Sequence, residues 1–417
     1  MLCNQTCIVL LLVTLTALIA PGVPATAQHR RAAQRVQLVG PFEHAPAPDT
    51  PSMLGHKFAS LAKIEPDHPL ADETADQTLS LFGREDLIAN RSGDYLPNLC
   101  APLSKTADVF TEIETIARAT SIVIINESHE RSEHRGFIAE IARRLRLLGY
   151  DTLAIETLAN SSPDTPEQHL PLFMRQPDLR YFVDKDGYYL SEAGFGRLGR
   201  LAKTLGYRLL PYESIFDGSI QTMTQDERIA RREEDQARNL AAFIQQYPST
   251  KLLVHVGYSH AIEVPRTDGT TWMAARLKEK TGVDPLTISQ TTCRGSGDRL
   301  RLSALPADEP TGTFDLIVDH PKARFKRHRP EWRRLIGDQP VSIPRSLRPV
   351  AGWRVIEARL LGEPIASVPM DRVAIRPGED IALMLPPGRY RLRVIDVPTA
   401  SKTPSEQTVS QLTAFED

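Results

Sequence analysis

Glutamate and histidine residues follow the short apolar runs of this sequence with notable regularity. The runs occupy 121–125, 152–155, 207–210, 252–256 and 286–289. The polar residues that follow them are Glu127, His129, Glu156, Glu213, His260 and Gln290. Turns after strands need only Gly, Asn or Asp. Grouped titratable side chains repel one another and cost stability, so this set of acids and imidazoles indicates a functional site.

Two kinds of chemistry suit such a set. Without a metal, a histidine beside a carboxylate takes a proton from water, and a second histidine protonates the leaving group. With a metal, imidazoles and carboxylates form a nitrogen and oxygen ligand set that leaves positions for water. The spacing of Glu127 and His129 does not decide between them. The candidate catalytic residues are Glu127, His129, Glu156 and His260, and the candidate metal ligands are Glu127, His129, His260 and Glu213.

The elements that must position these side chains are alternating helices and strands between residues 104 and 300. Helical patterns cover 104–118, 132–148, a stretch ending at Gly206, 224–247 and 271–281. Apolar runs separated by helices predict an α/β domain whose mostly parallel sheet is covered by helices on both faces. Ligands of such sheets bind beyond the carboxyl ends of the strands, which is where the acids and imidazoles lie.

Segments of different character flank this domain. Residues 28–103 are rich in Pro, Ala and charged residues, and we expect an extended or partly disordered arm. Residues 301–397 carry short alternating runs divided by Pro-Gly and Gly-Glu turns, which predicts a small antiparallel β domain. The polar tail 398–417 is expected to be flexible.

The N-terminus has the pattern of a secretory signal peptide over residues 1–27. An apolar run at 8–20 precedes the small-x-small cleavage pattern at 25–27. The run is shorter than the roughly 20 residues that span a bilayer. The mature chain is therefore expected to have no membrane span and to be periplasmic or secreted. An uncleaved anchor is the alternative, because residues 1–7 contain no Lys or Arg.

Two cysteines follow the predicted signal peptide. In an oxidising compartment, Cys100 and Cys293 are expected to form one disulfide. Two separately buried thiols are the alternative, because the sequence gives no distance between them.

The composition excludes several classes of protein. With 41% hydrophobic and 24% charged residues, the 417-residue chain is not wholly disordered, collagen-like or a polytopic membrane protein. The 50 Lys and Arg balance 52 Asp and Glu to a net charge of −2, which argues against nucleic-acid binding. The strongly basic segment 322–334 could meet an anionic surface or form a hydrated linker.

Several residues near these motifs have plainer interpretations. His134 lies either at the rim of the site or on a helix surface, and His255, inside an apolar strand, is more typical of a core histidine than of a ligand. The segment GYSHA at 257–261 nearly matches the Gly-x-Ser-x-Gly elbow of serine hydrolases, but Pro265 breaks the helix that such an elbow needs. Opposite charges along 228–239 predict a solvated helix face.

A superfamily pattern is visible in SIVIINESHERSEHRGFIAEIARRLRLLGYDTLAIETL at 121–158 and KLLVHVGYSHA at 251–261. The pattern is a strand, Gly-Glu-x-His, a helix, a Gly-aromatic pair, a strand that ends in Glu, and a later strand followed by Gly-x-x-His. Over about 104–290 the chain thereby resembles the superfamily of erythromycin esterase-like hydrolases, ChaN-like haem-uptake proteins and Tiki-type proteases.

The residues that match this pattern are Glu127, His129, Glu156 and His260. The resemblance implies that they serve hydrolysis or hold a metal or haem iron, with His129 and His260 as the haem-binding residues. Asn126 stands where glycine is usual. Arg131 and Arg135 match the arginine position of the esterases poorly, so the resemblance extends to the superfamily and not to macrolide esterase activity.

The sequence therefore predicts an exported hydrolase of an ester or amide bond, metal-assisted or not, that acts on a small-molecule or peptide substrate. The alternative is a haem- or iron-binding uptake protein of the ChaN-like type, without catalysis. A third interpretation is an enzyme-like domain that only binds partners through its β domain. The insert at 157–190, which should line the pocket, has no motif that names a substrate.

Overall fold

The computed structural model describes residues 35–49, 52–64, 73–103, 108–215, 221–265 and 269–398. The predicted signal peptide lies outside these residues, as does the predicted tail except for Pro398. The described residues from Val36 onward belong to one compact unit. No helix within the described ranges is long and apolar enough to cross a membrane.

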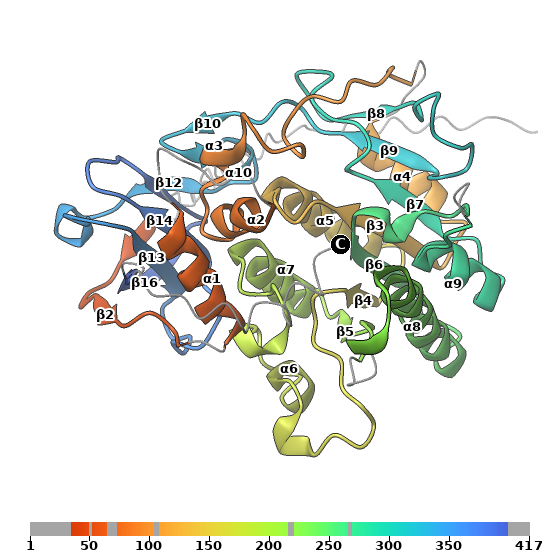
Figure 1. The fold of residues 1–417 in the computed structure, drawn as a ribbon, viewed down its shortest axis with the longest axis horizontal. Coiled ribbons are helices and arrows are strands. Elements are labelled where there is room, and N and C mark those ends of the chain that lie inside the picture. Colours follow the sequence, from red (N-terminus) through yellow and green to blue (C-terminus); the bar gives the residue numbers. More distant parts are fainter. Residues whose placement is uncertain are drawn as a thin grey trace, which may run out of the picture. The chain divides into compact units, whose positions relative to one another are not determined.

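A seven-stranded sheet forms the centre of the α/β part, with the strand order β5-β4-β6-β3-β7-β9-β8 (Figure 1). The strands are β3 (Ile122–Glu127), β4 (Thr152–Ile155), β5 (Arg208–Leu210), β6 (Leu252–Gly257), β7 (Leu286–Ser289), β8 (Arg301–Ser303) and β9 (Leu316–Asp319). All neighbours are parallel except β8, which pairs antiparallel with β9. The predicted, mostly parallel α/β sheet is confirmed, and β3 to β7 coincide with the five apolar runs.

Helices cover both faces of this sheet, because successive strand residues point to opposite sides. The helices are α4 (Val109–Ala117), α5 (Ser132–Arg146), α7 (Ala193–Thr204), α8 (Gln225–Gln246) and α9 (Met273–Thr281), with the short helix η4 (Tyr258–Ala261) after β6. Val123 and Ile125 of β3 pack with α4, α5 and α7 in one core. Ile122 and Ile124 pack with α8 and α9 in a second core on the other face.

The connection between β4 and α7 carries the insert that has no sequence motif. It contains the short helices η1 (Glu167–His169), α6 (Leu172–Arg175) and η2 (Asp184–Asp186). Phe173, Phe182 and Leu190 of the insert are buried in the same core as α5 and α7. The insert is therefore a packed part of the fold on that face of the sheet.

A second sheet, which we call the C-terminal sheet, is formed by β14, β13 and β16 in antiparallel order, with β1 and β2 added in parallel along β16. Its strands are β1 (Val36–Leu38), β2 (Glu43–Ala45), β13 (Arg354–Leu360), β14 (Asp371–Ile375) and β16 (Gly388–Asp396). Nearby elements are β10 (Phe325–Lys326), β11 (Arg329–Pro330), α10 (Trp332–Leu335), β12 (Gln339–Ser342), η5 (Arg345–Leu347) and β15 (Ala382–Leu385). The predicted antiparallel strands of the C-terminal region are confirmed.

The described residues between 36 and 103 form regular structure where the sequence predicts an extended or partly disordered arm. They supply β1, β2 and the helices α1 (Met53–Lys63), α2 (Glu73–Leu81) and α3 (Glu85–Ile88). Leu54, Phe58 and Leu61 repeat at helical spacing and pack in one core with Trp353. This segment adopts helices because it has a C-terminal partner to pack against, which its Pro-rich composition does not reveal.

The strands β8 and β9 lie beyond residue 300 and still belong to the seven-stranded sheet. The domain boundary expected between 300 and 301 therefore falls ahead of two strands of the α/β sheet.

Cys100 and Cys293 form a disulfide, with Cα atoms 5.8 Å apart. The expected bridge is confirmed. It joins the segment before α4 to the loop after β7.

Candidate functional site

The carboxyl ends of β3 to β6 bring the predicted acids and imidazoles together. Glu127 is the last residue of β3, Glu156 follows β4, and Glu213 follows β5; all three are buried. His260 is buried in η4, directly after β6. His129, two residues beyond β3, is partly exposed. The parallel sheet thus places all five residues at one edge.

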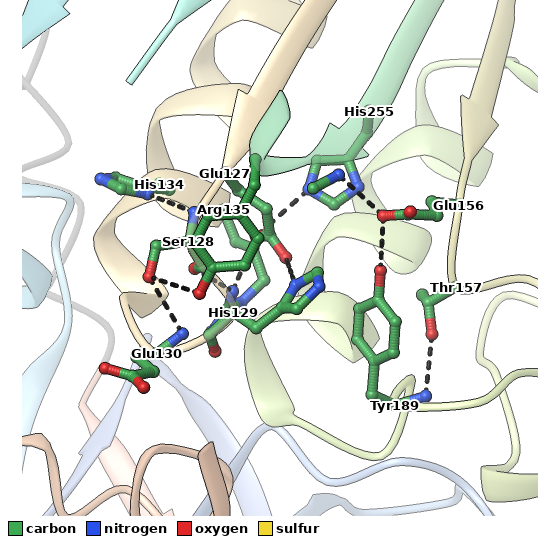
Figure 2. A network of polar contacts seen from close by, with 12 residues as sticks. Glu127, Ser128, His129, Glu130, His134, Arg135, Glu156, Thr157, Tyr189 and His255 are labelled. Carbon is green, nitrogen blue, oxygen red and sulfur yellow. Dashed lines mark hydrogen bonds and ion pairs between the residues drawn. The ribbon is translucent and has the colours of Figure 1, made fainter. Parts of the chain in front are cut away.

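Glu127 holds His129 with one oxygen and meets two nitrogen groups with the other (Figure 2). Its Oε1 lies 3.0 Å from Nδ1 of His129. Its Oε2 accepts a hydrogen bond from Arg135 at 2.7 Å and lies 3.2 Å from Nε2 of His255. Burial raises the pKa of Glu127, but Arg135 and His255 outweigh burial and hold that pKa well below its usual range. Glu127 is therefore a fixed carboxylate at neutral pH.

His129 has one ring nitrogen held and the other reachable. Because Nδ1 faces Glu127, the neutral ring carries its proton there and presents a lone pair at Nε2. None of the residues that the structure describes hydrogen-bonds to this Nε2. The side chain is 19% exposed, and its ring centroid lies 4.5 Å from that of Tyr189 and 5.1 Å from that of Tyr258. The imidazole is thus oriented and open to a ligand.

The site has two halves, one around Glu127 and one around Glu156. The first contains His129, Arg135 and His255, and the second contains Tyr189, Arg232 and His260. Gly257, the last residue of β6, lets the two halves approach each other. A Cβ atom at this position would lie 2.9 Å from Cε1 of His129 and 3.1 Å from Oε2 of Glu156. The backbone N–H of Gly257 donates to the same Glu156 oxygen at 2.7 Å. Its φ of −79° is ordinary, so glycine is required here for space and not for conformation.

Glu156 is bonded from several directions. The hydroxyl of Tyr189 donates to Oε2 at 2.8 Å and Arg232 donates to Oε1 at 2.7 Å, while Nε2 of His260 lies 3.3 Å from Oε1. Burial raises the pKa of Glu156, but Arg232 and His260 outweigh burial and bring that pKa to about 2. Because Tyr189 belongs to the insert between β4 and α7, the insert contributes directly to the site.

Arg232 of α8 is a site residue that the sequence analysis does not identify. Its guanidinium bridges Glu156 and Glu213, with a hydrogen bond of 2.7 Å to each. Gln236, one turn later, also donates to Glu213 at 3.0 Å. The neighbouring Arg231 is 28% exposed, but its partner Asp235 is buried, so the predicted solvated face is confirmed only in part. One helix therefore presents a solvated face and a face that completes the site.

His260 lies between two carboxylates. Its Nδ1 is 2.6 Å from Oε1 of Glu233, and its Nε2 is 3.3 Å both from Oε1 of Glu156 and from Nη1 of Arg232. Burial lowers the pKa of His260, but Glu233 and Glu156 outweigh burial and raise it above its usual value. The second oxygen of Glu233 accepts from the backbone N–H of Met273 at 2.7 Å. The two carboxylates therefore favour the protonated form of this buried imidazole.

The segment before the disulfide also reaches the site. Asp94 accepts hydrogen bonds from the hydroxyl of Tyr258, at 2.8 Å, and from the hydroxyl of Ser128. Tyr258 has a φ of +30°, a backbone conformation that residues other than glycine rarely adopt. This strained turn places the ring of Tyr258 beside His129 and begins the short helix that carries His260.

Two neighbouring histidines have structural roles, and a neighbouring serine has no partner among the described residues that would activate it. His134 is buried, its Nδ1 accepts the N–H of Ser128 at 2.9 Å, and burial holds its pKa well below the usual value. His255 is a buried strand histidine that also contacts Glu127. No imidazole in the described part of the chain hydrogen-bonds to the hydroxyl of Ser259. Ser259 also lies within the short η4, so the arrangement lacks the features of a serine nucleophile.

The carboxylates of this site are already matched by protein cations. Over the ranges that the structure describes, no three His, Cys, Asp or Glu side chains are grouped to hold one metal ion. Glu127 and Glu213 bond to arginines, and both ring nitrogens of His260 face charged side chains. A divalent cation on Glu127, His129 and His260 does not fit this arrangement. A haem held by both His129 and His260 does not fit it either.

The basic segment 322–334 is largely ion-paired. Arg329 and Arg333 are buried, and both bond to Asp371 of β14. The other pairs are Arg324 with Asp298, Arg327 with Asp380 and His328 with Asp86. Most of its charge thus serves the fold, and an anionic partner for this segment stays a prediction.

No family model matches the chain, and no curated protein matches it. One similar solved structure is the type III effector HopBA1 (TM-score 0.33, 15% identity, covering 54% of this chain and 97% of that chain). Another is RRSP, a MARTX toxin effector domain from Vibrio vulnificus CMCP6 (TM-score 0.35, 13% identity, 58% and 48%). A third is ChaN of Campylobacter jejuni with cofacially bound haem (TM-score 0.31, 10% identity, 50% and 91%). All three likenesses are distant, and the superfamily named above stays a prediction.

Proposed function

We propose that the protein hydrolyses an ester or amide bond by acid-base catalysis at the carboxyl ends of β3, β4 and β6. The pair of Glu127 and His129 carries this proposal, because a buried carboxylate holds one ring nitrogen and leaves the other reachable. A histidine oriented in this way is suited to take a proton from a nucleophile near neutral pH.

The proposed base is Nε2 of His129. It accepts a proton from water as the water oxygen attacks the carbonyl carbon of the substrate. Glu127 stays ionised and stabilises the imidazolium that forms, because Arg135 fixes its second oxygen. The same proton then passes from Nε2 to the leaving alcohol or amine as the C–O or C–N bond breaks. His129 returns to its neutral form at the end of this sequence.

Arg232 and His260 are the proposed electrostatic partners of the developing oxyanion. The side chain of Arg232 is 14% exposed and His260 is buried. Charge stabilisation is stronger in such a setting than in water. Their bonds to Glu156 and Glu213 hold them in place before a substrate arrives. Their positive charge offsets part of the negative charge of Glu156, Glu213 and Glu233, which would otherwise repel an oxyanion more strongly.

Export of the protein is part of this proposal. The pattern of residues 1–27 motivates it. The disulfide between Cys100 and Cys293 supports it, because disulfides persist in oxidising compartments and are rare in reducing ones.

The test of the function is a panel of chromogenic esters and anilides, assayed with the wild-type protein, His129→Ala and His169→Ala. His169 is an exposed histidine in η1, so its replacement is a matched control. We expect turnover to vanish in His129→Ala and to persist in His169→Ala, with unchanged circular dichroism in both.

An absorption spectrum of the same samples distinguishes the alternative. A Soret band that disappears in His129→Ala, without turnover of any substrate, would replace hydrolysis with haem binding. Turnover that persists in His129→Ala, or its absence from a colourless wild-type protein across the panel, would also overturn the proposal.

A further inference from the structure

The first turn of α7 forms one wall of the candidate site. The ring of Phe195 packs edge-on against His255 and Tyr189, with centroids 5.3 and 5.4 Å apart. The guanidinium carbon of Arg135 lies 5.0 Å from the centroid of the same ring. Phe195 therefore contacts residues from both halves of the site, and the placement of this turn affects both.

Glu192 connects this turn with the proposed base. It is the N-cap of α7, and its Oε2 accepts the backbone N–H of Gly194 at 2.7 Å. The same oxygen accepts a hydrogen bond from Nε of Arg135 at 2.8 Å. Nη1 of Arg135 donates to Glu127, which holds His129. A continuous chain of charged hydrogen bonds thus runs from the start of α7 to the proposed base.

The C-terminal sheet fixes the residue just before Glu192. Arg372 of β14, whose side chain is 0% exposed, donates a hydrogen bond from Nη1 to the carbonyl oxygen of Ser191. Its Nε and Nη2 both lie 2.7 Å from Oε1 of Glu357 on β13. Nη2 is also 3.8 Å from Asp184 of the insert. This buried arginine therefore joins the C-terminal sheet to the segment that leads into α7.

A second set of contacts fastens α7 and the insert to the same region. A Cβ atom on Gly196 would lie 2.6 Å from Cγ1 of Val368, so a glycine is needed for this close approach. The N–H of Val368 donates to the carbonyl of Phe182 at 2.8 Å, and its own carbonyl accepts from Arg200 at 2.7 Å. The insert and α7 are thus held against the chain just before β14.

We propose that Arg372 is a positioning residue for the proposed base, His129. Arg372 fixes the carbonyl of Ser191, and the turn that follows holds Arg135 where it orders Glu127. The C-terminal sheet then holds the first turn of α7 in place beside the site. This inference rests on the hydrolytic function proposed above.

The groups around His129 determine how its ring should respond when Arg372 is replaced. They come from β3, the segment after β4, α5, the insert and η4, and they are Glu127, Glu156, Arg135, Tyr189 and Tyr258. The chain that begins at Arg372 reaches His129 through Arg135 and Glu127. Loosening it should change the Nδ1 side of the imidazole, where Glu127 holds the proton.

Arg372→Lys is the direct test. Lysine keeps a positive charge beside Glu357 but replaces the rigid guanidinium fork with one ammonium on a flexible stem, so it should not hold the carbonyl of Ser191 in the same fixed geometry. The readout is the ¹⁵N chemical shift of the His129 ring nitrogens, which reports the nitrogen that carries the proton. We expect mixed tautomers in the variant. On an ester that the wild type turns over, we expect kcat to fall about 10- to 100-fold with little change in KM.

Arg354→Lys is the matched control. Arg354 of β13 makes the same kinds of bond, to the carboxylate of Asp396 at 2.6 Å and to the carbonyls of Leu347 and Arg348 at 3.1 and 3.2 Å. None of these partners belongs to the insert or to α7. We expect this variant to keep the wild-type ring shifts and kcat even where its melting temperature falls.

Glu192→Gln gives a second route to the answer if Arg372→Lys does not fold. Glutamine keeps an oxygen that can cap α7 but lacks the charge that holds Arg135. We expect the same mixing of tautomers at His129. Wild-type ring shifts in Glu192→Gln and in folded Arg372→Lys would overturn the positioning role. Failure of the hydrolytic function has a different signature, in which His129→Ala keeps the wild-type rate while the ring shifts still respond to Arg372→Lys.

Discussion

The two glutamate–histidine pairs of the site place the same residue types in opposite settings. In the pair of Glu127 and His129, the carboxylate contacts Nδ1 and the imidazole is 19% exposed. In the pair of Glu233 and His260, the imidazole is 9% exposed, and a second carboxylate, that of Glu156, lies beside its other nitrogen. The first ring can exchange a proton with a ligand, and the second is enclosed.

The two imidazoles differ in the number of carboxylates within ion-pair distance, which is one for His129 and two for His260. One carboxylate orients the ring and stabilises its cation but leaves a nitrogen that can accept a proton. Two carboxylates outweigh burial and raise the pKa of His260, which favours its protonated form. We therefore assign the first pair to proton transfer and the second to fixed positive charge.

The largest effects should come from replacing each histidine in turn. His129→Gln should lower kcat by about 10²- to 10⁴-fold, because the proposed base is lost, with little change in the free energy of unfolding. His260→Gln should lower the free energy of unfolding by about 3–5 kcal/mol, because Glu233 loses a buried cationic partner. Steady-state kinetics and urea unfolding check both variants. Equal losses of rate and stability in the two would remove the distinction between the pairs.

The next effect concerns the arginine that joins the second pair to Glu213. Arg232→Met should cost about 3–5 kcal/mol of unfolding free energy, because it leaves the buried carboxylates of Glu156 and Glu213 without their shared cation. Arg231→Met, one residue away on the more exposed side of α8, should cost no more than about 1 kcal/mol. Urea unfolding of both variants at pH 7 is the measurement. A cost for Arg232→Met as small as that of Arg231→Met would show that the bridge does not stabilise the fold.

The strand-end residues could be predicted from the sequence because of the parallel sheet. Buried parallel strands appear as short apolar runs, and the sheet brings the residues after each run to one edge. This reasoning identifies Glu127 and Glu156 without any knowledge of their contacts. It does not identify Arg135, which lies on a helix and not at a strand end. Arg135 precedes the buried Ile138 and Ala142 by three and seven residues, so it continues the apolar face of α5.

The face of α8 that contacts the site is recognisable from the spacing of its residues. Ala237 and Leu240 are buried, and Glu233 and Gln236 precede them by four residues each. These two polar residues therefore continue the apolar face of the helix, where charge needs a buried partner. The charge pattern of 228–239 predicts a solvated face because pairs such as Arg231 with Asp235 are common on exposed helix surfaces.

The helices of residues 36–103 could not be predicted because their partners are distant in sequence. Phe58 and Leu79 are buried in a core that includes Trp353 and Val355, nearly three hundred residues later. Tertiary packing of this kind overrides weak local propensity. The contribution of Asp94 to the site depends on the same long-range packing and on the bridge between Cys100 and Cys293.

The contact between the two halves can be weakened with one methyl group. Gly257→Ala should displace His129 or Glu156, because the new Cβ atom would lie 2.9 to 3.1 Å from both side chains. We expect kcat to fall about 10- to 100-fold with the fold retained, since an error of 1 Å near a reacting group can cost that much. Gly93→Ala is the control, because a Cβ atom there meets nothing within 4 Å. Kinetics like those of the wild type in Gly257→Ala would mean that the halves work independently.

The stability should also depend on pH, with opposite signs for Glu156 and His260. Burial raises the pKa of Glu156, but Arg232 and His260 bring it to about 2, below its unfolded value of 4.5. Its contribution to stability is therefore complete above pH 4.5 and is lost as pH falls toward 2. The pKa of His260 is raised from 6.5 by Glu233 and Glu156 against the effect of burial. Its contribution is complete below pH 6.5 and is lost as pH rises through the folded pKa.

Urea unfolding between pH 2 and pH 9 should therefore show a loss of unfolding free energy at each end, and the shift of the Glu156 pKa from 4.5 to about 2 corresponds to about 3 kcal/mol at the acid end. His260→Gln should abolish the alkaline loss, because glutamine does not titrate. It should also leave part of the acid loss, because Arg232 still holds Glu156 ionised in the folded state. An alkaline loss that persists unchanged in His260→Gln would belong to another group, and His260 would then not be the fixed cation of the second pair.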